Sequence, residues 1–529
     1  MLKFLFTFFL SVLALAVSAQ RPIDVIHYKY DISLRDKSDS IKGKADILVK
    51  FNQSSKTISF DLASIENGKG MKVSASLKDS VSLSAEHSSN KLRLTLPSEA
   101  KAGDTLMITI QYAGIPSDGL IISKNKYGHR SFFADNWPNR GHNWLPCVDD
   151  PGDKATVEFI VNAPQHYQVV ANGVQVEETD LSDGNKITHW KEDVPIATKV
   201  MVIGVASFAV NLAGMIDACI PVYSWVYPED RDAGFYDYAQ ALEILPFFIK
   251  NVGPYGYKKL ANVQSKTTFG GLENANTIFY HENSVGGNRK SETLITHEIA
   301  HQWFGNMATE KSFAHLWLSE GFATYMTILY MESKYGRDTA ISMLREDRNQ
   351  ILAYAKQQKN PVVYETTEYM KLLNPNSYQK GGWVLHMLRQ QLGDSLFWKS
   401  IRSYYSQYAG SNADTRDLQA IFEKVSGKKL NTFFDQWLYT AGHPVLDIQW
   451  KYLQNENRVS ITVKQTQGTT FRFPLELGFK NANAKMVYKT FQIEKDVQQL
   501  SFPVPQKIVE VMADPNVGLL FEGKINEAK

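Results

Sequence analysis

Apolar and polar residues alternate through the first part of the chain. Apolar side chains occupy every second position in four stretches: Ile26, Tyr28, Tyr30, Ile32 and Leu34; Ala45, Ile47, Val49 and Phe51; Leu92, Leu94 and Leu96; and Leu106, Ile108 and Ile110. A period of two places one face of a strand in a core and the other nearer water, as in antiparallel sheets. We therefore predict an N-terminal antiparallel β domain over residues 20–211.

Helical spacing replaces this alternation after about residue 225. It runs through residues 235–254, 291–306 and 383–393, and Gly393 stands where a helix is expected to end. Residues 212–442 are therefore predicted to form a mainly helical domain.

Alternation returns from residue 445. Apolar positions recur in three further stretches: Leu446, Ile448, Trp450 and Tyr452; Val459, Ile461 and Val463; and Phe473, Leu475, Leu477 and Phe479. Asn455, Glu456 and Asn457 are typical of a turn between the first two stretches. Residues 443–529 are predicted to form a C-terminal β-sandwich, which makes the whole chain an α+β multidomain protein. A length of 529 residues agrees with several domains.

The N-terminal residues have the pattern of a secretory signal peptide. Lys3 supplies a positive start, the run from Leu5 to Val17 is almost wholly apolar, and Val17-Ser18-Ala19 offers small residues for cleavage. An uncleaved signal anchor is the alternative, because the apolar run is of borderline length for crossing about 30 Å of hydrocarbon. We expect residues 1–19 to be removed and the protein to be exported, either to the periplasm or out of the cell. No later segment is apolar enough to span a bilayer.

Charge and cysteine content narrow the classes of function. The formal net charge is +2, from 57 basic and 55 acidic residues, so the chain has no bulk electrostatic reason to bind nucleic acid or an anionic membrane. Its cysteines are Cys147 and Cys219. They either pair in a disulfide or stay as two buried thiols, and two thiolates alone do not make a zinc site. Any metal must therefore be held by His and carboxylate side chains.

The segment T-H-E-I-A-H-Q-W-F-G-N carries a metal-binding pattern. His297 and His301 are four residues apart, which puts both imidazoles on one face of a helix, and Glu298 lies beside them. Glu320 follows His301 after 18 residues, enough for one helix to end near Gly305 and another to return, and its neighbours are apolar. A buried carboxylate needs a partner, and three protein ligands with one open position are typical of catalytic zinc. Two hydrogen-bonded core histidines and a surface glutamate are the alternative.

Further motifs carry a family resemblance. Gly270-Gly271-Leu272-Glu273-Asn274 matches G-x-M-E-N, and Tyr378-Gln379-Lys380-Gly381 matches Y-x-K-G. Residues 146–151, followed by Lys154-Ala155-Thr156, match another signature. Together with the H-E-x-x-H pattern and its distant Glu, these motifs resemble the aminopeptidase N family of zinc peptidases (gluzincins), which includes leukotriene hydrolase. The resemblance covers nearly all of the chain after the leader.

The resemblance implies a thermolysin-like catalytic domain with one Zn²⁺ per chain, held by His297, His301 and Glu320. Glu298 would act as a general base and then as an acid, and the Tyr378 hydroxyl would donate a hydrogen bond to the oxyanion. The substrate-binding loop would be made of Gly270, Gly271, Leu272, Glu273 and Asn274. In that loop the carboxylate of Glu273 would pair with the free α-amine of a peptide.

Two positions depart from the family pattern. Leu272 stands where the family has Met, a change that conserves volume. Trp137 lies nine residues before Pro146, where the family usually has a Gln or Glu that helps to bind the substrate amine. Asp135 or Asn136 is the alternative amine ligand in this chain.

These observations predict a zinc aminopeptidase that acts on peptides with a free N-terminus and has no nucleic-acid partner. A zinc endopeptidase is one alternative, and Glu273 and Tyr378 weigh against it. A scaffold protein that keeps the fold without activity is another, and the intact set of metal and catalytic residues weighs against that. Larger family members carry a further helical domain over the active site, and we expect a more open cleft here that accepts longer peptides. Neither the preferred first residue nor the oligomeric state follows from the sequence.

Overall fold

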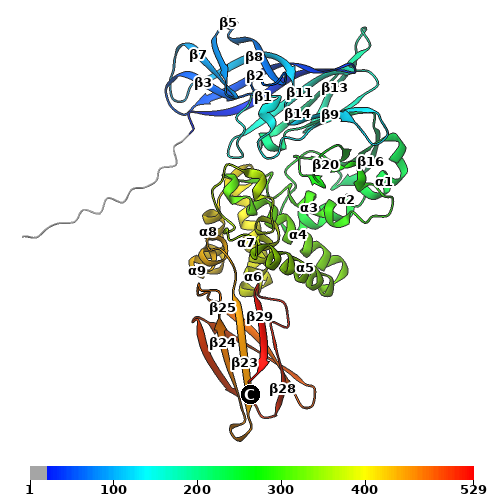
Figure 1. The fold of residues 1–529 in the computed structure, drawn as a ribbon. Coiled ribbons are helices and arrows are strands. Elements are labelled where there is room, and N and C mark those ends of the chain that lie inside the picture. Colours follow the sequence, from blue (N-terminus) through cyan, green and yellow to red (C-terminus); the bar gives the residue numbers. More distant parts are fainter. Residues whose placement is uncertain (1–20, 529) are drawn as a thin grey trace, which may run out of the picture.

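Three regions follow one another along the molecule (Figure 1). The computed structural model describes residues 21–528, so the predicted signal peptide lies outside the described residues. The β-rich N-terminal region stands at one end, the helices lie in the middle, and the C-terminal strands form the other end (Figure 1). The predicted fold class, α+β with a β domain, a mainly helical domain and a C-terminal β-sandwich, is confirmed. The exact domain boundaries stay a prediction.

The N-terminal region is built from three sheets. The largest has the strand order β13-β14-β11-β1-β2-β8-β4-β5, with the bounds Val174–Asp180, Asn185–Ala197, Lys154–Pro164, Ile23–Arg35, Ser38–Phe51, Thr105–Ile115, Gly70–Lys78 and Val81–Ser82. A second sheet pairs β3 (Ser55–Asp61), β7 (Lys91–Ala100) and β6 (Ser84–Ser88). A third pairs β12 (Gln168–Ala171), β15 (Ile203–Ala206), β10 (Arg130–Ala134) and β9 (Leu120–Lys124). Among the described strands of this region, β1 and β11 run parallel and the other pairs are antiparallel.

The predicted alternation holds in β1, with one exception. Tyr28, Tyr30 and Ile32 are buried as expected, whereas Ile26 is 37% exposed. The pairing of β1 with β2 shifts register between Val25 and His27. Because a bulge adds one residue to a strand, it reverses which face the preceding side chains occupy, and Val25 is buried in place of Ile26.

Helices make up most of the middle region. They are α1 (Arg231–Tyr238), α2 (Ala241–Asn251), α3 (Glu292–Ala300), α4 (Trp317–Tyr335), α5 (Arg337–Ala355), α6 (Gly381–Leu392), α7 (Asp394–Tyr408), α8 (Thr415–Ser426) and α9 (Asn431–Phe434). The stop predicted at Gly393 is confirmed, because α6 ends there and the glycine has φ +79°. Asp414 caps α8 by accepting hydrogen bonds from the backbone of Arg416 and Asp417.

A five-stranded sheet accompanies these helices. Its order is β16 (Ala209–Ile216), β17 (Ile220–Val226), β18 (Leu260–Ser265), β20 (Thr277–His281) and β19 (Gly271–Leu272). Strand β18 is parallel to both of its neighbours, whereas β19 runs antiparallel to β20 at the sheet edge. A short parallel pair, β21 (Ala308–Glu310) and β22 (Ser411–Ala413), lies apart from it. The edge strand β19 contacts α3, which brings the Gly-rich loop to the predicted metal-binding helix.

The C-terminal region consists of two sheets. One has the order β27 (Val497–Pro503), β24 (Arg458–Gln465), β23 (Val445–Leu453) and β29 (Glu522–Glu527), and the other has the order β26 (Met486–Ile493), β25 (Phe473–Asn481) and β28 (Ile508–Ala513). The two sheets meet where the ring of Phe479 in β25 packs edge to face on that of Phe502 in β27, with centroids 4.7 Å apart. Asn457 has φ +48° in the turn that joins β23 to β24, where the sequence predicted a turn.

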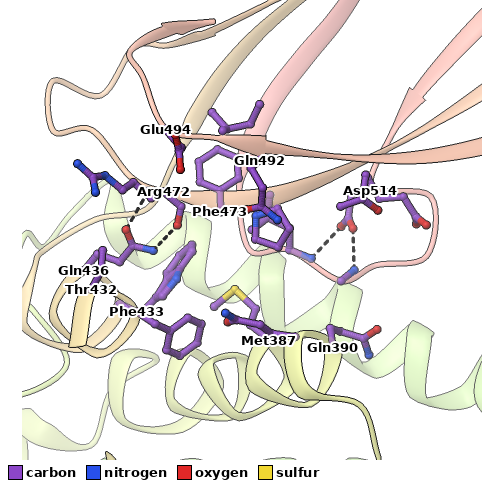
Figure 2. Close-up of a pocket in the computed structure, with 18 of the residues that line it drawn as sticks. Met387, Gln390, Thr432, Phe433, Gln436, Arg472, Phe473, Gln492, Glu494 and Asp514 are labelled. Atoms are coloured by element: carbon purple, nitrogen blue, oxygen red, sulfur yellow. Dashed lines mark hydrogen bonds between the residues drawn. The ribbon is translucent and has the colours of Figure 1, made fainter. Parts of the chain in front are cut away.

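Buried polar contacts join the three regions. Lys199 and Glu310 form an ion pair of 2.5 Å whose side chains are 1% and 0% exposed, and it links the N-terminal region to strand β21 of the middle region. His386 on α6 lies 2.8 Å from the carbonyl of Val517 in the C-terminal region. Figure 2 shows the cavity at this second junction, about 680 Å³ in volume. There the side-chain amide of Gln436 makes two hydrogen bonds to the backbone of Arg472 (2.7 and 2.9 Å).

The two cysteines do not pair. Cys147 is buried and Cys219 is exposed, and both are free thiols. Neither alternative from the sequence therefore holds in full, because there is no disulfide between these residues and one of the thiols faces solvent. Within residues 21–528, no helix has both the length and the apolar character needed to cross a membrane.

Candidate active site

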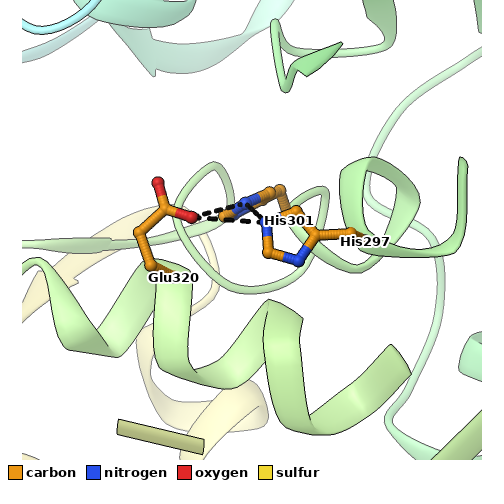
Figure 3. Close-up of side chains that lie close together, drawn as sticks. All are labelled: His297, His301 and Glu320. Carbon is orange, nitrogen blue, oxygen red and sulfur yellow. Dashed lines mark hydrogen bonds and ion pairs between the residues drawn. The ribbon is translucent and has the colours of Figure 1, made fainter. Parts of the chain in front are cut away.

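His297, His301 and Glu320 come together as the sequence predicts (Figure 3). His297 is in α3, His301 directly follows that helix, and Glu320 lies in the first turn of α4. Oε2 of Glu320 lies 3.3 Å from Nε2 of His297 and 3.2 Å from Nε2 of His301, and the two Nε2 atoms are 3.1 Å apart. Among the described residues, these form a group of His and carboxylate ligand atoms close enough to hold one metal ion.

Helix α3 ends earlier than predicted. It stops at Ala300 rather than near Gly305, and the chain turns beyond His301 through a hydrogen bond from the Asn306 amide to the His301 carbonyl. Gly305 has φ +111°, and a Cβ there would lie 3.2 Å from Nδ1 of His301. A residue with a side chain would be strained in this conformation, so the glycine allows the loop to pass close behind the ligand.

The hydrogen bonds of His301 select its metal-binding tautomer. Its Nδ1 lies 3.1 Å from the carbonyl oxygen of Phe304 and 3.1 Å from Oγ of Ser319. Because a carbonyl only accepts, Nδ1 carries the proton when the ring is neutral, and this tautomer leaves the lone pair of Nε2 facing Glu320. A second partner that orients the ring in this way is typical of metal-binding histidines.

The electrostatics of the cluster favour a shared cation. Burial acts to raise the pKa of Glu320, but the facing His301 and His297 outweigh it and hold that pKa well below its ordinary value. Burial likewise acts to lower the pKa of His301, and the carboxylate of Glu320 outweighs it and raises the pKa to about 9. Two imidazoles and a carboxylate are the donor set of a catalytic zinc site with one open position. The residues present therefore fit that metal.

Gly271 allows Glu298 to lie directly against the sheet edge. Glu298 is 5% exposed, and a Cβ on Gly271 would fall 2.6 Å from its Cγ and closer still to its carboxylate. At the neighbouring Gly270 the nearest atom to such a Cβ is 3.8 Å away, an ordinary contact. Burial, opposed by the charge of His301, raises the pKa of Glu298 well above its ordinary value.

Glu273 brings a buried carboxylate to the same cavity. It is 5% exposed, and its Oε1 has no hydrogen-bond partner among the described residues. Asn274 beside it is fully buried, and both polar atoms of its side chain also lack a partner there. A buried carboxylate without a partner costs free energy, and a bound cation would offset that cost. Glu273 is therefore a candidate to bind a cationic group of a ligand. Leu272 is buried at 3% exposure in this loop.

Two residues that the sequence analysis did not single out hold this loop. Nε2 of Gln302 and Nδ2 of Asn306 both donate to the carbonyl oxygen of Glu273, at 3.1 and 2.5 Å. Oε1 of Gln302 also accepts from the backbone amide of Asn276 (2.8 Å). Both residues belong to the segment that contains the H-E-x-x-H pattern. A polar residue among apolar neighbours in that segment was the sequence feature that could have pointed to them.

Tyr378 faces the cluster from another element. It lies in a π-helical turn, Asn376–Lys380, and its ring stacks on that of His297 with centroids 6.0 Å apart and planes 12° apart. Burial and the carboxylate of Glu320 raise its pKa well above the ordinary value, so the phenol keeps its proton and can donate a hydrogen bond.

The cavity beside the cluster has a volume of about 250 Å³, and its polar lining residues are Glu273, Glu298, Tyr378, His297, His301 and Glu320. Trp137 also lines it, whereas Asp135 and Asn136 do not. Asp135 pairs with Arg140 and accepts a hydrogen bond from Thr267 (3.2 Å). Asn136 donates to the carbonyls of Thr198 and Met201, so its amide serves the fold.

Comparison with known proteins adds two family matches. Residues 25–200 match the Peptidase M1 N-terminal domain, and residues 236–437 match the Peptidase family M1 domain. Aminopeptidase M1 of Arabidopsis thaliana is 27% identical over 360 residues, which cover 63% of this chain and 41% of the plant protein. Tricorn protease-interacting factor F2 of Thermoplasma volcanium is 28% identical over 411 residues, covering 73% of this chain and 49% of the archaeal protein. Glutamyl aminopeptidase of Homo sapiens is 24% identical over 449 residues, covering 78% and 46%. The chain thus spans less than half the length of these curated relatives.

Proposed function

Because the chain belongs to peptidase family M1, we propose that it is a zinc-dependent aminopeptidase that removes the first residue from peptides with a free α-amine. One observation carries the proposal. Glu273, a buried carboxylate with one oxygen that has no partner within residues 21–528, shares a small cavity with the cluster of His297, His301 and Glu320.

His297, His301 and Glu320 would hold the zinc ion. When bound, the ion would polarise the scissile carbonyl and bring the pKa of an attacking water to about 7. Ser319 and the Phe304 carbonyl support this role, because they keep the proton of His301 on Nδ1.

Glu298 would take the proton of the attacking water and then deliver it to the leaving amine. It lines the cavity from the metal-binding helix, and its side chain is held against Gly271 at the sheet edge. A positioned acid–base group of this kind contributes about 10²–10⁴-fold to a rate. Tyr378 would donate its hydroxyl proton as a hydrogen bond to the oxyanion, a contribution of about 10²–10³-fold in kcat.

Glu273 would limit cleavage to the first peptide bond. Its hydrogen bonds to a protonated α-amine would contribute about 1.5–3 kcal/mol. A blocked or internal peptide would leave the carboxylate desolvated and unpaired, at a cost of about 2–5 kcal/mol. The cavity volume of about 250 Å³ agrees with a single residue, since sites that bury larger ligands span about 300–1,000 Å³.

The proposal includes export. The signal-peptide pattern over residues 1–19 supports cleavage and action in the periplasm or outside the cell. Sequencing the N-terminus of the protein recovered from outside the cytoplasm tests this, and a mature protein that retains Met1 would contradict it.

Chromogenic amino-acid anilides, each with a free and an N-acetylated amine, test the activity. Wild-type protein should cleave only the free-amine forms, and a chelator should abolish cleavage until zinc is restored. Glu273→Gln should lower kcat/KM for the free-amine forms by about tenfold to a hundredfold. Glu346→Ala, which removes an exposed glutamate from α5, is the matched control and should leave the rate unchanged. Equal cleavage of acetylated substrates would mean an endopeptidase. No cleavage by folded, zinc-loaded protein would mean a scaffold.

A further inference from the structure

Five apolar side chains line the catalytic cavity and have no part in the proposed chemistry. They belong to Trp137, Phe269, Leu272, Leu294 and Leu373, and together we call them the apolar wall. Trp137 comes from the N-terminal region, and the other residues come from the middle region. Apolar walls around a few converging polar groups are typical of a site that selects a ligand by the shape and polarity of one part.

The aromatic part of this wall is held firmly. The rings of Trp137 and Phe269 meet edge to face, with centroids 5.9 Å apart, and Trp137 makes a similar contact with Phe313 at 6.1 Å. The guanidinium of Arg140 lies 5.8 Å from the centre of the Phe269 ring. Trp137 is only 2% exposed. A wall made of packed rings keeps its shape, so it can discriminate between side chains that differ by a few carbon atoms.

The side chains of the two polar residues before Trp137 already have partners elsewhere in the protein, so neither lines the cavity. Asp135 is occupied by Arg140 and Thr267, and the Asn136 side chain is occupied by three partners, the carbonyls of Thr198 and Met201 and the indole N–H of Trp144. The N-terminal region therefore presents an indole to the cavity where a carboxylate or amide was the alternative. Recognition of the substrate amine is left to Glu273.

The charges around the cavity disfavour substrates whose first residue is acidic or basic. In the part of the chain that the structure describes, no Lys or Arg lines the cavity, and the carboxylates that line it are Glu273, Glu298 and Glu320. An acidic first side chain would meet like charge without a cation of the protein to pair with. A basic first side chain would lose water against the apolar wall, because each of the three carboxylates already serves the amine, the proton transfer or the metal.

On the basis of the proposed function, we propose that the enzyme acts on peptides whose first residue is large, uncharged and apolar, aromatic above all, and that Trp137 is the residue that determines this preference. The first side chain is attached to the carbon that bears the amine. With the amine at Glu273, that side chain has to lie within the same small cavity, against Trp137 and its apolar neighbours.

A panel of free-amine p-nitroanilides of Phe, Leu, Ala, Lys and Glu tests the assignment. Wild-type protein should cleave the Phe and Leu substrates with a kcat/KM at least about tenfold above that for Ala, because each extra methylene in an apolar pocket is worth about 10–200-fold. Lys and Glu substrates should be poorer than Leu. A preference for Ala, Lys or Glu would overturn the inference and leave the proposed function standing.

Variants of Trp137 locate the preference. Trp137→Ala should lower the Phe-to-Ala ratio of kcat/KM by about tenfold, whereas Trp137→Phe, which keeps an aromatic wall, should retain most of the ratio. Trp398→Ala removes a partly buried indole of α7 outside the cavity and is the matched control, with an unchanged ratio expected. Leu373→Ala removes another part of the wall and should lower the ratio even if Trp137→Ala does not fold. A folded Trp137→Ala protein with the wild-type ratio would overturn the assignment. Failure of the wild type to cleave any free-amine substrate would instead refute the proposed function.

Discussion

The substitution Gly271→Ala, which adds a single methyl group, should lower the catalytic rate without unfolding the protein. A Cβ at this position would lie 2.6 Å from Cγ of Glu298, and moving Cγ to an ordinary contact of 3.4 Å takes about 0.8 Å. The carboxylate lies closer still, so it has to move by about 1 Å. Misplacing a catalytic group by about 1 Å costs about 10²-fold in rate. We therefore expect Gly271→Ala to lower kcat about a hundredfold.

The same change should leave the protein folded. Gly271 is not in the left-handed region, so alanine meets no backbone strain there. Overpacking of this size costs about 1–3 kcal/mol of stability, and the free end of a side chain can move to relieve part of it. Thermal unfolding should therefore show only a small decrease in Tm, and zinc content should match that of the wild type.

Gly270→Ala is the matched control for this experiment. It adds the same methyl group one residue earlier, where the nearest atom is an ordinary 3.8 Å away. Kinetics with a leucine anilide should give the hundredfold loss of kcat for Gly271→Ala and a much smaller loss for Gly270→Ala, whose methyl group enters the cavity without displacing Glu298. Equal kcat values for the two variants, or an equal loss in both, would refute the reasoning from the Gly271–Glu298 contact.

Three further predictions concern metal, charge and pH. Chelation should lower the Tm of the wild type in a calorimetric scan. The reason is that a ligand that binds only the folded state, at a hundred times its Kd, adds about 2.7 kcal/mol to the free energy of unfolding. Glu320→Gln should show a much smaller shift in Tm on chelation. Lys199→Met should destabilise the protein by about 3–5 kcal/mol in denaturant unfolding by leaving Glu310 buried without its cation, and Lys199→Met/Glu310→Gln should recover most of that loss; a single variant as stable as the wild type would contradict this. Burial lowers the pKa of His386 from 6.5 to about 4, so the unfolded chain takes up the proton first as the pH falls. The contribution of His386 is therefore complete above pH 6.5 and decreases by about 3 kcal/mol toward pH 4. Unfolding free energies of wild type and His386→Gln across this range should converge by that amount, and parallel curves would rule it out.

The sequence predicted the strands and site residues that are marked by a pattern within a short stretch of the chain. Strands with one wet face, such as β1, alternate in polarity and were found, whereas β18 was missed because all six of its residues are buried. His297 and His301 were found because helix geometry turns a spacing of four into a shared face. The bulge that exposes Ile26 and the early end of α3 depend on pairing and packing with distant residues, which leave no local signal.

The same distinction applies within the site. Glu298 and Glu320 were identified from motifs, but the hydrogen bonds of Gln302 and Asn306 to the Glu273 carbonyl join segments about thirty residues apart. The apolar wall likewise brings Trp137 beside Phe269, which is more than a hundred residues away along the chain. Only the folded arrangement could reveal what these side chains contact.

The clamp that Gln302 and Asn306 place on the Glu273 carbonyl has a consequence for how such an enzyme changes over evolution. These two hydrogen bonds tie the loop proposed to bind the amine to the segment that follows α3. The distance from the N-terminus of a substrate to the bond that breaks would therefore be set within the middle region. Trp137, which we propose selects the first side chain, belongs to the N-terminal region. On these proposals the place of cleavage depends on the middle region, whereas the preference for the first residue depends also on the N-terminal region. A mutation of Trp137 can therefore alter the preference while the place of cleavage stays constant.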